Sequence, residues 1–228
     1  MLKNPVTLAI ALALATASLG LPAESAQAAS KESVQAMNPF FQQSPLPLHY
    51  PQFDKIKIEH FVPAFDRGMA DNLREVETIA NNEKAPTFEN TILAMEKSGQ
   101  LLSRALTVFG NYTSTVSNDE LEKIDADYSS KFAAHFDAVS LNPKLFARVK
   151  TLYNSRNTLG LDAEGVRLIE RYYTDFVRSG ANLTEAQKTR VKAINAEMAT
   201  LTTQFGQNVL AEVNDSAVIV SDKAELDG

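Results

Sequence analysis

The sequence predicts an all-α protein, a bundle of about six helices, and three observations support this expectation. Apolar residues recur at steps of three and four through most of the chain, which is the spacing of one face of an α-helix. Helix-capping residues stand where these apolar stripes begin, so two independent signals agree on the helix starts. Gly and Pro, which mark turns and loops, number only nine each in 228 residues. This is few for a fold of many short strands, which needs many turns.

The first two helices are expected over about 59–80 and from Thr87 onward. Pro63 falls in the first turn of the first helix, where its missing N–H costs no hydrogen bond. The first stripe consists of Phe61, Phe65, Met69, Leu73, Val76 and Ile79. The second helix is expected to continue without a break along Phe88, Ile92, Met95, Leu102, Leu106 and Phe109.

The remaining four helices each begin at a side chain that accepts a hydrogen bond from the first turn. These starts are Ser117 with Glu120 as a capping box, Asn142 before Pro143, Asp162, and Thr184 with Gln187 as a second capping box. Gly160 and Gly180 end the fourth and fifth helices, because glycine readily adopts the left-handed conformation that follows many helices. The sixth stripe consists of Val191, Ile194, Met198, Leu201, Phe205 and Val209.

The C-terminal residues differ from the rest of the chain. The apolar run 217–220 is flanked by Asn, Asp and Ser residues, which is typical of a short β-strand. No second strand candidate occurs in the sequence, and a lone strand leaves its backbone groups without a ladder. We therefore expect its partner to lie in sequence beyond this chain; a frayed tail is the competing interpretation.

Residues 1–28 have the three-part pattern of a secretory signal peptide. Lys3 supplies the positive start, 6–21 is an apolar run rich in Ala and Leu, and cleavage is expected between Ala28 and Ala29. A membrane anchor is the competing interpretation, but the run is shorter than the ~20 residues that a spanning helix needs. We expect an exported protein without a stable membrane anchor, periplasmic if the source is Gram-negative and otherwise secreted.

Residues 29–57 are expected to form an extended, proline-rich arm across the helical region 58–228. Four prolines break any long element in the arm: Pro39, Pro45, Pro47 and Pro51. Its aromatic and aliphatic residues are too frequent for a free linker, so they are expected to anchor it.

Composition excludes several classes of protein. Lys and Arg number 22 against 28 Asp and Glu, and this net charge of -6 argues against nucleic acid as a partner. The chain has no cysteine, which excludes a disulfide scaffold, a zinc ribbon and a cysteine nucleophile.

The residues show no catalytic or metal-binding constellation. A catalytic zinc needs about three converging protein ligands, and the three histidines, His49, His60 and His135, form no spaced pair. Glu59-His60 reverses the order of an H-E-x-x-H motif and lacks its second histidine, so His60 is expected to cap or pack at a helix start. No G-x-S-x-G element occurs. We therefore assign no catalytic and no metal residue.

Three aromatic residues on the fifth helix are the candidates for lining a peptide site. They are Tyr172, Tyr173 and Phe176, although aromatic residues at helical spacing more often form a core stripe.

Ordered blocks resemble the N-terminal part of a known peptidase family. The blocks are 38–40, 53–56, 60–65, 86–92, 141–149, 176–181 and 205–210. In this order they resemble the thimet-oligopeptidase-like zinc metallopeptidases, and among these the bacterial peptidyl-dipeptidases of the Dcp type. The resemblance extends over the chain from about residue 38 onward.

This resemblance implies a mostly helical fold divided by a deep channel, with zinc held on an H-E-x-x-H helix and short peptides as substrates. Peptidyl-dipeptidases release dipeptides from free C-termini. The N-terminal helices form part of the channel wall, so Tyr172, Tyr173 and Phe176 become candidate channel-wall residues.

The zinc motif of the family lies C-terminal to the matching region. This chain alone is therefore expected to bind no zinc and to be inactive, with the missing C-terminal catalytic region as its partner. Without that region, an exposed apolar face is expected on the helices. The alternative is a stand-alone, non-catalytic helical module that binds peptides or partners.

Overall fold

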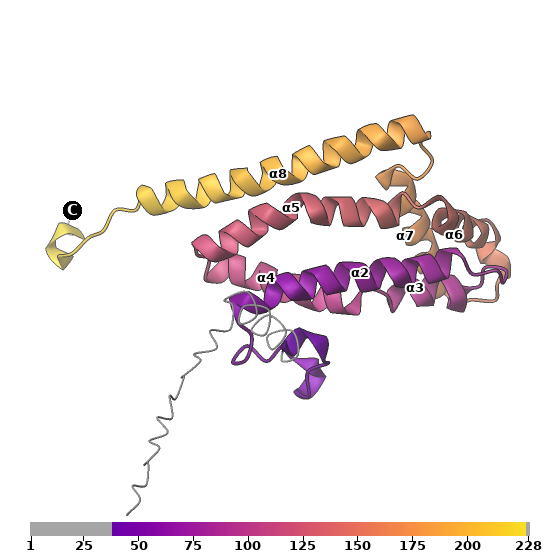
Figure 1. Cartoon of the computed structure of the whole chain (residues 1–228), viewed down its shortest axis with the longest axis horizontal. Coiled ribbons are helices and arrows are strands. Elements are labelled where there is room, and N and C mark those ends of the chain that lie inside the picture. The colour runs from indigo at the N-terminus through magenta and orange to yellow at the C-terminus, as the bar shows by residue number, and fades with distance from the viewer. Residues whose placement is uncertain (1–37, 227–228) are drawn as a thin grey trace, which may run out of the picture. The chain divides into compact units, whose positions relative to one another are not determined.

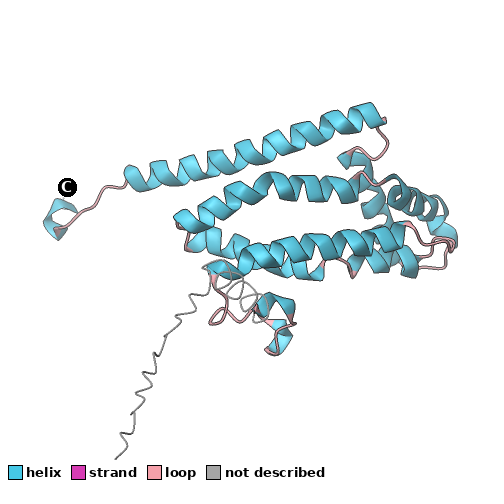
Figure 2. Cartoon of the chain, in the orientation of Figure 1, coloured by secondary structure: helices cyan, strands magenta, loops and turns pink. Residues whose placement is uncertain are grey.

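Helices dominate the computed structural model, which describes residues 38–226 (Figure 1). In this part of the chain, six helices have 13 residues or more: α2 (Phe61–Ala80), α4 (Gln100–Thr115), α5 (Asp119–Ser140), α6 (Pro143–Ser155), α7 (Ala163–Ser179) and α8 (Glu185–Asp215). Figure 2 shows no strand among the described residues. The predicted all-α bundle is confirmed.

Three of the predicted helix starts are also confirmed. Asn142 Oδ1 accepts hydrogen bonds from the backbone N–H groups of Lys144 and Leu145, both at 3.0 Å. Asp162 Oδ1 accepts from the N–H of Gly165 at 2.8 Å. Thr184 begins α8 with the predicted capping box. Local sequence therefore fixes where these helices begin.

The second helix is not continuous, contrary to the prediction. A π-helix, η4 (Phe88–Leu93), leads into the short α3 (Ala94–Glu96), and α4 starts only after Gly99. Gly99 has φ +69°, and a Cβ there would lie 2.9 Å from Asn72 Nδ2. Its N–H donates to Glu75 Oε2 at 2.7 Å. The left-handed backbone and this tertiary hydrogen bond break the helix at Gly99.

The start of α5 lies one residue later than predicted. Asn118 is the N-cap, and its Oδ1 accepts from the N–H groups of Glu120 and Leu121 at 3.1 and 3.0 Å. The Ser117 hydroxyl instead donates to Glu122 Oε1 at 3.3 Å. The amide oxygen of Asn118 thus replaces the expected Ser117 capping box.

The predicted strand over 217–220 is wrong for this structure. These residues follow α8 without regular secondary structure, and the described part of the chain contains no strand to pair with them. Val218 and Ile219 are almost fully exposed. An isolated apolar, β-branched run has the composition of a strand but not the ladder that forms one.

Two buried clusters form the core of the bundle. The first joins the N-terminal half of α2 to α4 and the start of α5 around Phe61, Phe65 and Phe109. The second joins the C-terminal half of α2 to η4, α6 and α7 around Ile92, Leu145, Val149 and Ile169. The single apolar stripe of α2 thus contributes its N-terminal half to the first cluster and its C-terminal half to the second.

The described part of the proline-rich arm, residues 38–57, contains two short 3₁₀ turns, Pro39–Phe41 and Pro47–His49. Phe40 is buried in the first cluster, and its carbonyl accepts a hydrogen bond from Arg104 Nη2 at 3.1 Å. Leu48, by contrast, is 99% exposed. Part of the arm is therefore anchored on α4.

The expected signal peptide, 1–28, and its cleavage site between Ala28 and Ala29 lie outside the described residues. Within 38–226, no helix combines the length and the apolarity that crossing a bilayer requires.

Candidate functional site

His60 closes the turn that leads into α2. Its Nδ1 accepts a hydrogen bond from the backbone N–H of Lys57 at 3.0 Å, and its carbonyl accepts one from Asn38 Nδ2 at 2.8 Å. Burial lowers the pKa of His60, and the nearby Glu59 carboxylate opposes this shift. The interpretation of His60 as a capping and packing residue is confirmed.

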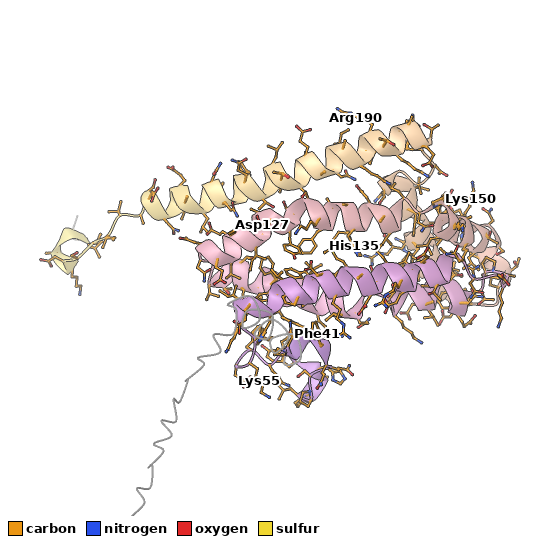
Figure 3. The ribbon with its side chains drawn as sticks, viewed as in Figure 1. Phe41, Lys55, Asp127, His135, Lys150 and Arg190 are labelled. Atoms are coloured by element: carbon orange, nitrogen blue, oxygen red, sulfur yellow. The ribbon has the colours of Figure 1, made fainter. Side chains whose placement is uncertain are left out.

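His135 is buried between α5 and α2 (Figure 3). Its Nε2 lies 2.9 Å from Asn72 Oδ1, while its Nδ1 is buried without a hydrogen-bond partner. Burial lowers the pKa of this imidazole, because the charged form would lose its hydration. His135 therefore acts as a neutral polar contact between two helices.

Within 38–226, the residues do not fit a zinc site. His49 lies in the arm, exposed, with its Nδ1 2.9 Å from the carbonyl oxygen of Ser44. No group of three or more His, Cys, Asp or Glu side chains converges anywhere in 38–226. A zinc site needs about three such ligands, so the described residues offer none that could hold the ion.

The three candidate aromatic residues of α7 occupy different environments. Phe176 is 5% exposed and stacks on Phe146, with ring centroids 5.9 Å apart. Tyr173 stacks on Tyr153 at 3.8 Å. Both therefore pack α7 against α6, as the competing core interpretation expects. Their candidate role in a channel wall stays a prediction.

Tyr172, the third candidate, ties α7 to α3. Its hydroxyl donates to Glu96 Oε1 at 2.5 Å. Burial and this hydrogen bond raise the pKa of Tyr172, so the phenol is neutral and donates at ordinary pH. The contact places one carboxylate and one phenol on the same surface.

Arg148, which sequence reasoning missed, fixes the loop that leads into η4. Its side chain on α6 is 7% exposed, and its Nη1 donates to the carbonyls of Asn82 and Lys84 at 2.7 and 3.1 Å. Its Nη2 and Nε donate to Asn90 Oδ1 and Thr91 Oγ1 at 2.8 and 3.3 Å. The only sequence signal is a cation at an otherwise apolar position of an amphipathic helix.

A cavity of about 470 Å³, lined mostly by polar residue types, lies between α8 and the region where α4 turns into α5. Its lining includes Thr113, Ser117, Asp125 and Thr203. Burial raises the pKa of Asp125. Gln207 Nε2 closes one side by donating to the carbonyl of Glu122 at 2.8 Å. This hydrogen bond joins α8 to α5 beside the cavity.

The apolar stripe of α8 is exposed. Its members keep 40–69% of their surface accessible: Ile194, Met198, Leu201, Phe205, Val209 and Val213. The other long helices contribute buried side chains to the two core clusters. An exposed apolar face was expected for this chain, and α8 carries it.

The fold and these surfaces define a helical segment whose described residues offer no metal site and whose longest helix lacks an apolar cover. No protein-family model matches the chain. Over 192 residues, 84% of the chain, it is 45% identical to dipeptidyl carboxypeptidase of Escherichia coli (strain K12). It is 44% identical over 191 residues to dipeptidyl carboxypeptidase of Salmonella typhimurium, and 26% identical over 178 residues to oligopeptidase A of Haemophilus influenzae.

The chain is therefore a homologue of part of the dipeptidyl carboxypeptidases, and the predicted resemblance is confirmed. It spans 28% of the length of the dipeptidyl carboxypeptidases that it matches.

Proposed function

We propose that this chain is the N-terminal helical region of an exported zinc metallopeptidase that releases dipeptides from the C-termini of short peptides. The observation that carries the proposal is the 45% identity to a dipeptidyl carboxypeptidase over 84% of the chain. The weaker similarity to oligopeptidase A supports a peptidase and is less specific about where the peptide is cut.

In this proposal, the helical region shapes the substrate channel and a C-terminal catalytic region holds the metal. Bound zinc would supply an activated water and polarise the scissile carbonyl. The described residues offer no ligand cluster, so no catalytic step is assigned to them. The chain alone is expected to hydrolyse no peptide, with or without added zinc.

The contribution proposed for this chain is to position the peptide and limit access to the channel. Among the three candidate wall residues, Tyr172 fits this role better than Phe176, because Phe176 is buried in the core. The Tyr172 hydroxyl and the Glu96 carboxylate lie on one surface and could contact peptide N–H and C=O groups.

The test uses the protein encoded by the complete reading frame, incubated with an N-blocked tetrapeptide. The expected product is the C-terminal dipeptide, identified by mass spectrometry, with activity lost on chelation and restored by zinc. Cleavage at internal bonds without dipeptide release would indicate an oligopeptidase. A protein that cleaves no bond of the tetrapeptide would favour the stand-alone binding module.

Export is a separate part of the proposal and has its own test. N-terminal sequencing of the protein recovered from outside the cytoplasm is expected to begin at Ala29. Recovery in the cytoplasm with residues 1–28 still attached would contradict it.

A further inference from the structure

The position of the exposed stripe on α8 is fixed by how α8 contacts α5. The two helices run antiparallel: Asn195 Nδ2 donates to Asp137 Oδ1 at 2.6 Å near one end, and Gln207 bonds to Glu122 near the other. Figure 1 shows α8 running alongside α5. Polar side chains thus hold α8 to α5 at these two points.

The apolar stripe lies on a different side of the helix. Consecutive residues of an α-helix are about 100° apart, so Ile194 lies about a quarter turn from Asn195, and Phe205 about a quarter turn from Gly206. Asn195 contacts α5, and Gly206 lines the cavity between α8 and the α4–α5 turn. The stripe thus points past α5 instead of onto it.

The stripe has the composition of an interface core. Between Ile194 and Ala211, Glu197 is the only charged residue. Large apolar side chains at helical spacing with few charges are typical of a buried contact surface and unusual on a solvated helix. The stripe runs over residues 194–213 of α8, so at a rise of 1.5 Å per residue this surface is about 30 Å long.

We propose that this stripe, residues 194–213 of α8, is the surface on which the remaining part of the peptidase docks. The inference rests on the proposed function. The relatives supply the occupant, because this chain spans only 28% of their length. In this chain α8 is the last long helix described, so the remaining polypeptide would enter directly beside the stripe.

The docking surface is tested by co-expressing the whole tagged chain with the part of the Escherichia coli dipeptidyl carboxypeptidase that its match leaves out. The wild-type chain is expected to capture that polypeptide. Phe205→Glu should weaken capture at least about tenfold, because it places a charge at the centre of an apolar contact. Leu48→Glu is the matched control, since Leu48 is 99% exposed and lies on the arm.

Four results would contradict either the docking surface or the proposed function, and they tell the two apart. Equal capture by all three chains overturns the stripe as the docking surface and leaves the proposed function standing. Failure of the wild-type chain to capture the co-expressed part overturns the inference. A wild-type homodimer that Phe205→Glu dissociates also overturns it in favour of a second copy. A captured, stripe-dependent complex that releases no dipeptide speaks against the proposed function and leaves the docking surface intact.

Discussion

Replacing Arg148 with alanine removes the side chain that holds residues 82–91 against α6. Four hydrogen bonds from its guanidinium are lost, two of them to backbone carbonyls, at distances of 2.7 to 3.3 Å. A hydrogen bond to a charged group contributes about 1.5–3 kcal/mol, and bonds from one group are not additive. We therefore expect a loss of about 3 kcal/mol in the free energy of unfolding.

Urea unfolding followed by circular dichroism measures this loss. For a domain of this size, about 3 kcal/mol corresponds to a decrease of roughly 10 °C in Tm. Hydrogen exchange should also accelerate locally over 82–93, because the loop before η4 loses its anchor. Arg148→Lys is the control that keeps a positive charge without the planar guanidinium and its several N–H donors. It should recover only part of the lost free energy of unfolding.

A decrease below about 1 kcal/mol for Arg148→Ala would refute this reasoning. It would mean that water replaces the guanidinium at the carbonyls of Asn82 and Lys84 without cost. Faster exchange spread evenly over the bundle, instead of over 82–93, would equally contradict a local anchoring role.

Three further predictions concern the core, the helix break and pH. Phe65→Ala should cost about 3–5 kcal/mol in urea unfolding, because Phe65 is fully buried and contacts four aromatic rings; a loss under 1.5 kcal/mol would contradict that packing. Gly99→Ala should lower the Tm, because its φ is +69° and the new Cβ would meet Asn72 at 2.9 Å. An unchanged or higher Tm would show that the helix break between α3 and α4 does not depend on glycine at this position. Burial holds the pKa of His135 below its unfolded value of about 6.5, so the unfolded chain binds the proton first as pH falls. Stability should therefore be fully present above about pH 6.5 and decline below it, and His135→Gln should reduce this decline between pH 7.5 and 5.

The helix starts could be predicted because their signals are local. Asn142, Asp162 and Thr184 hydrogen-bond to backbone groups within three residues, so no tertiary knowledge is needed. The break at Gly99 depends instead on Glu75 and Asn72, which lie far away in sequence. The apolar stripe continues in phase across the break, and periodicity alone therefore predicts one helix.

The candidate site shows the same division between local and tertiary information. Spacing identified Tyr172, Tyr173 and Phe176 as one stripe, but it could not separate the buried Phe176 from Tyr172, which bonds to Glu96. Arg148 was missed because its four partners come from another part of the chain. The resemblance to the peptidase family rests on the order of short sequence blocks along the chain. Block order can be read without knowing which residues are in contact.

Periodicity also identified the apolar face of α8 without revealing what covers it. Fully burying a large aliphatic or aromatic side chain contributes about 1.5–3 kcal/mol, so covering six that are about half exposed contributes on the order of 6 kcal/mol. That is comparable with the whole stability of a typical domain. Docking of the remaining peptidase on 194–213 would therefore couple the folding of this helical region to the assembly of the enzyme. Glutamate at Phe205 should then lower the stability of the assembled enzyme more than that of the isolated chain, where the ring already faces water.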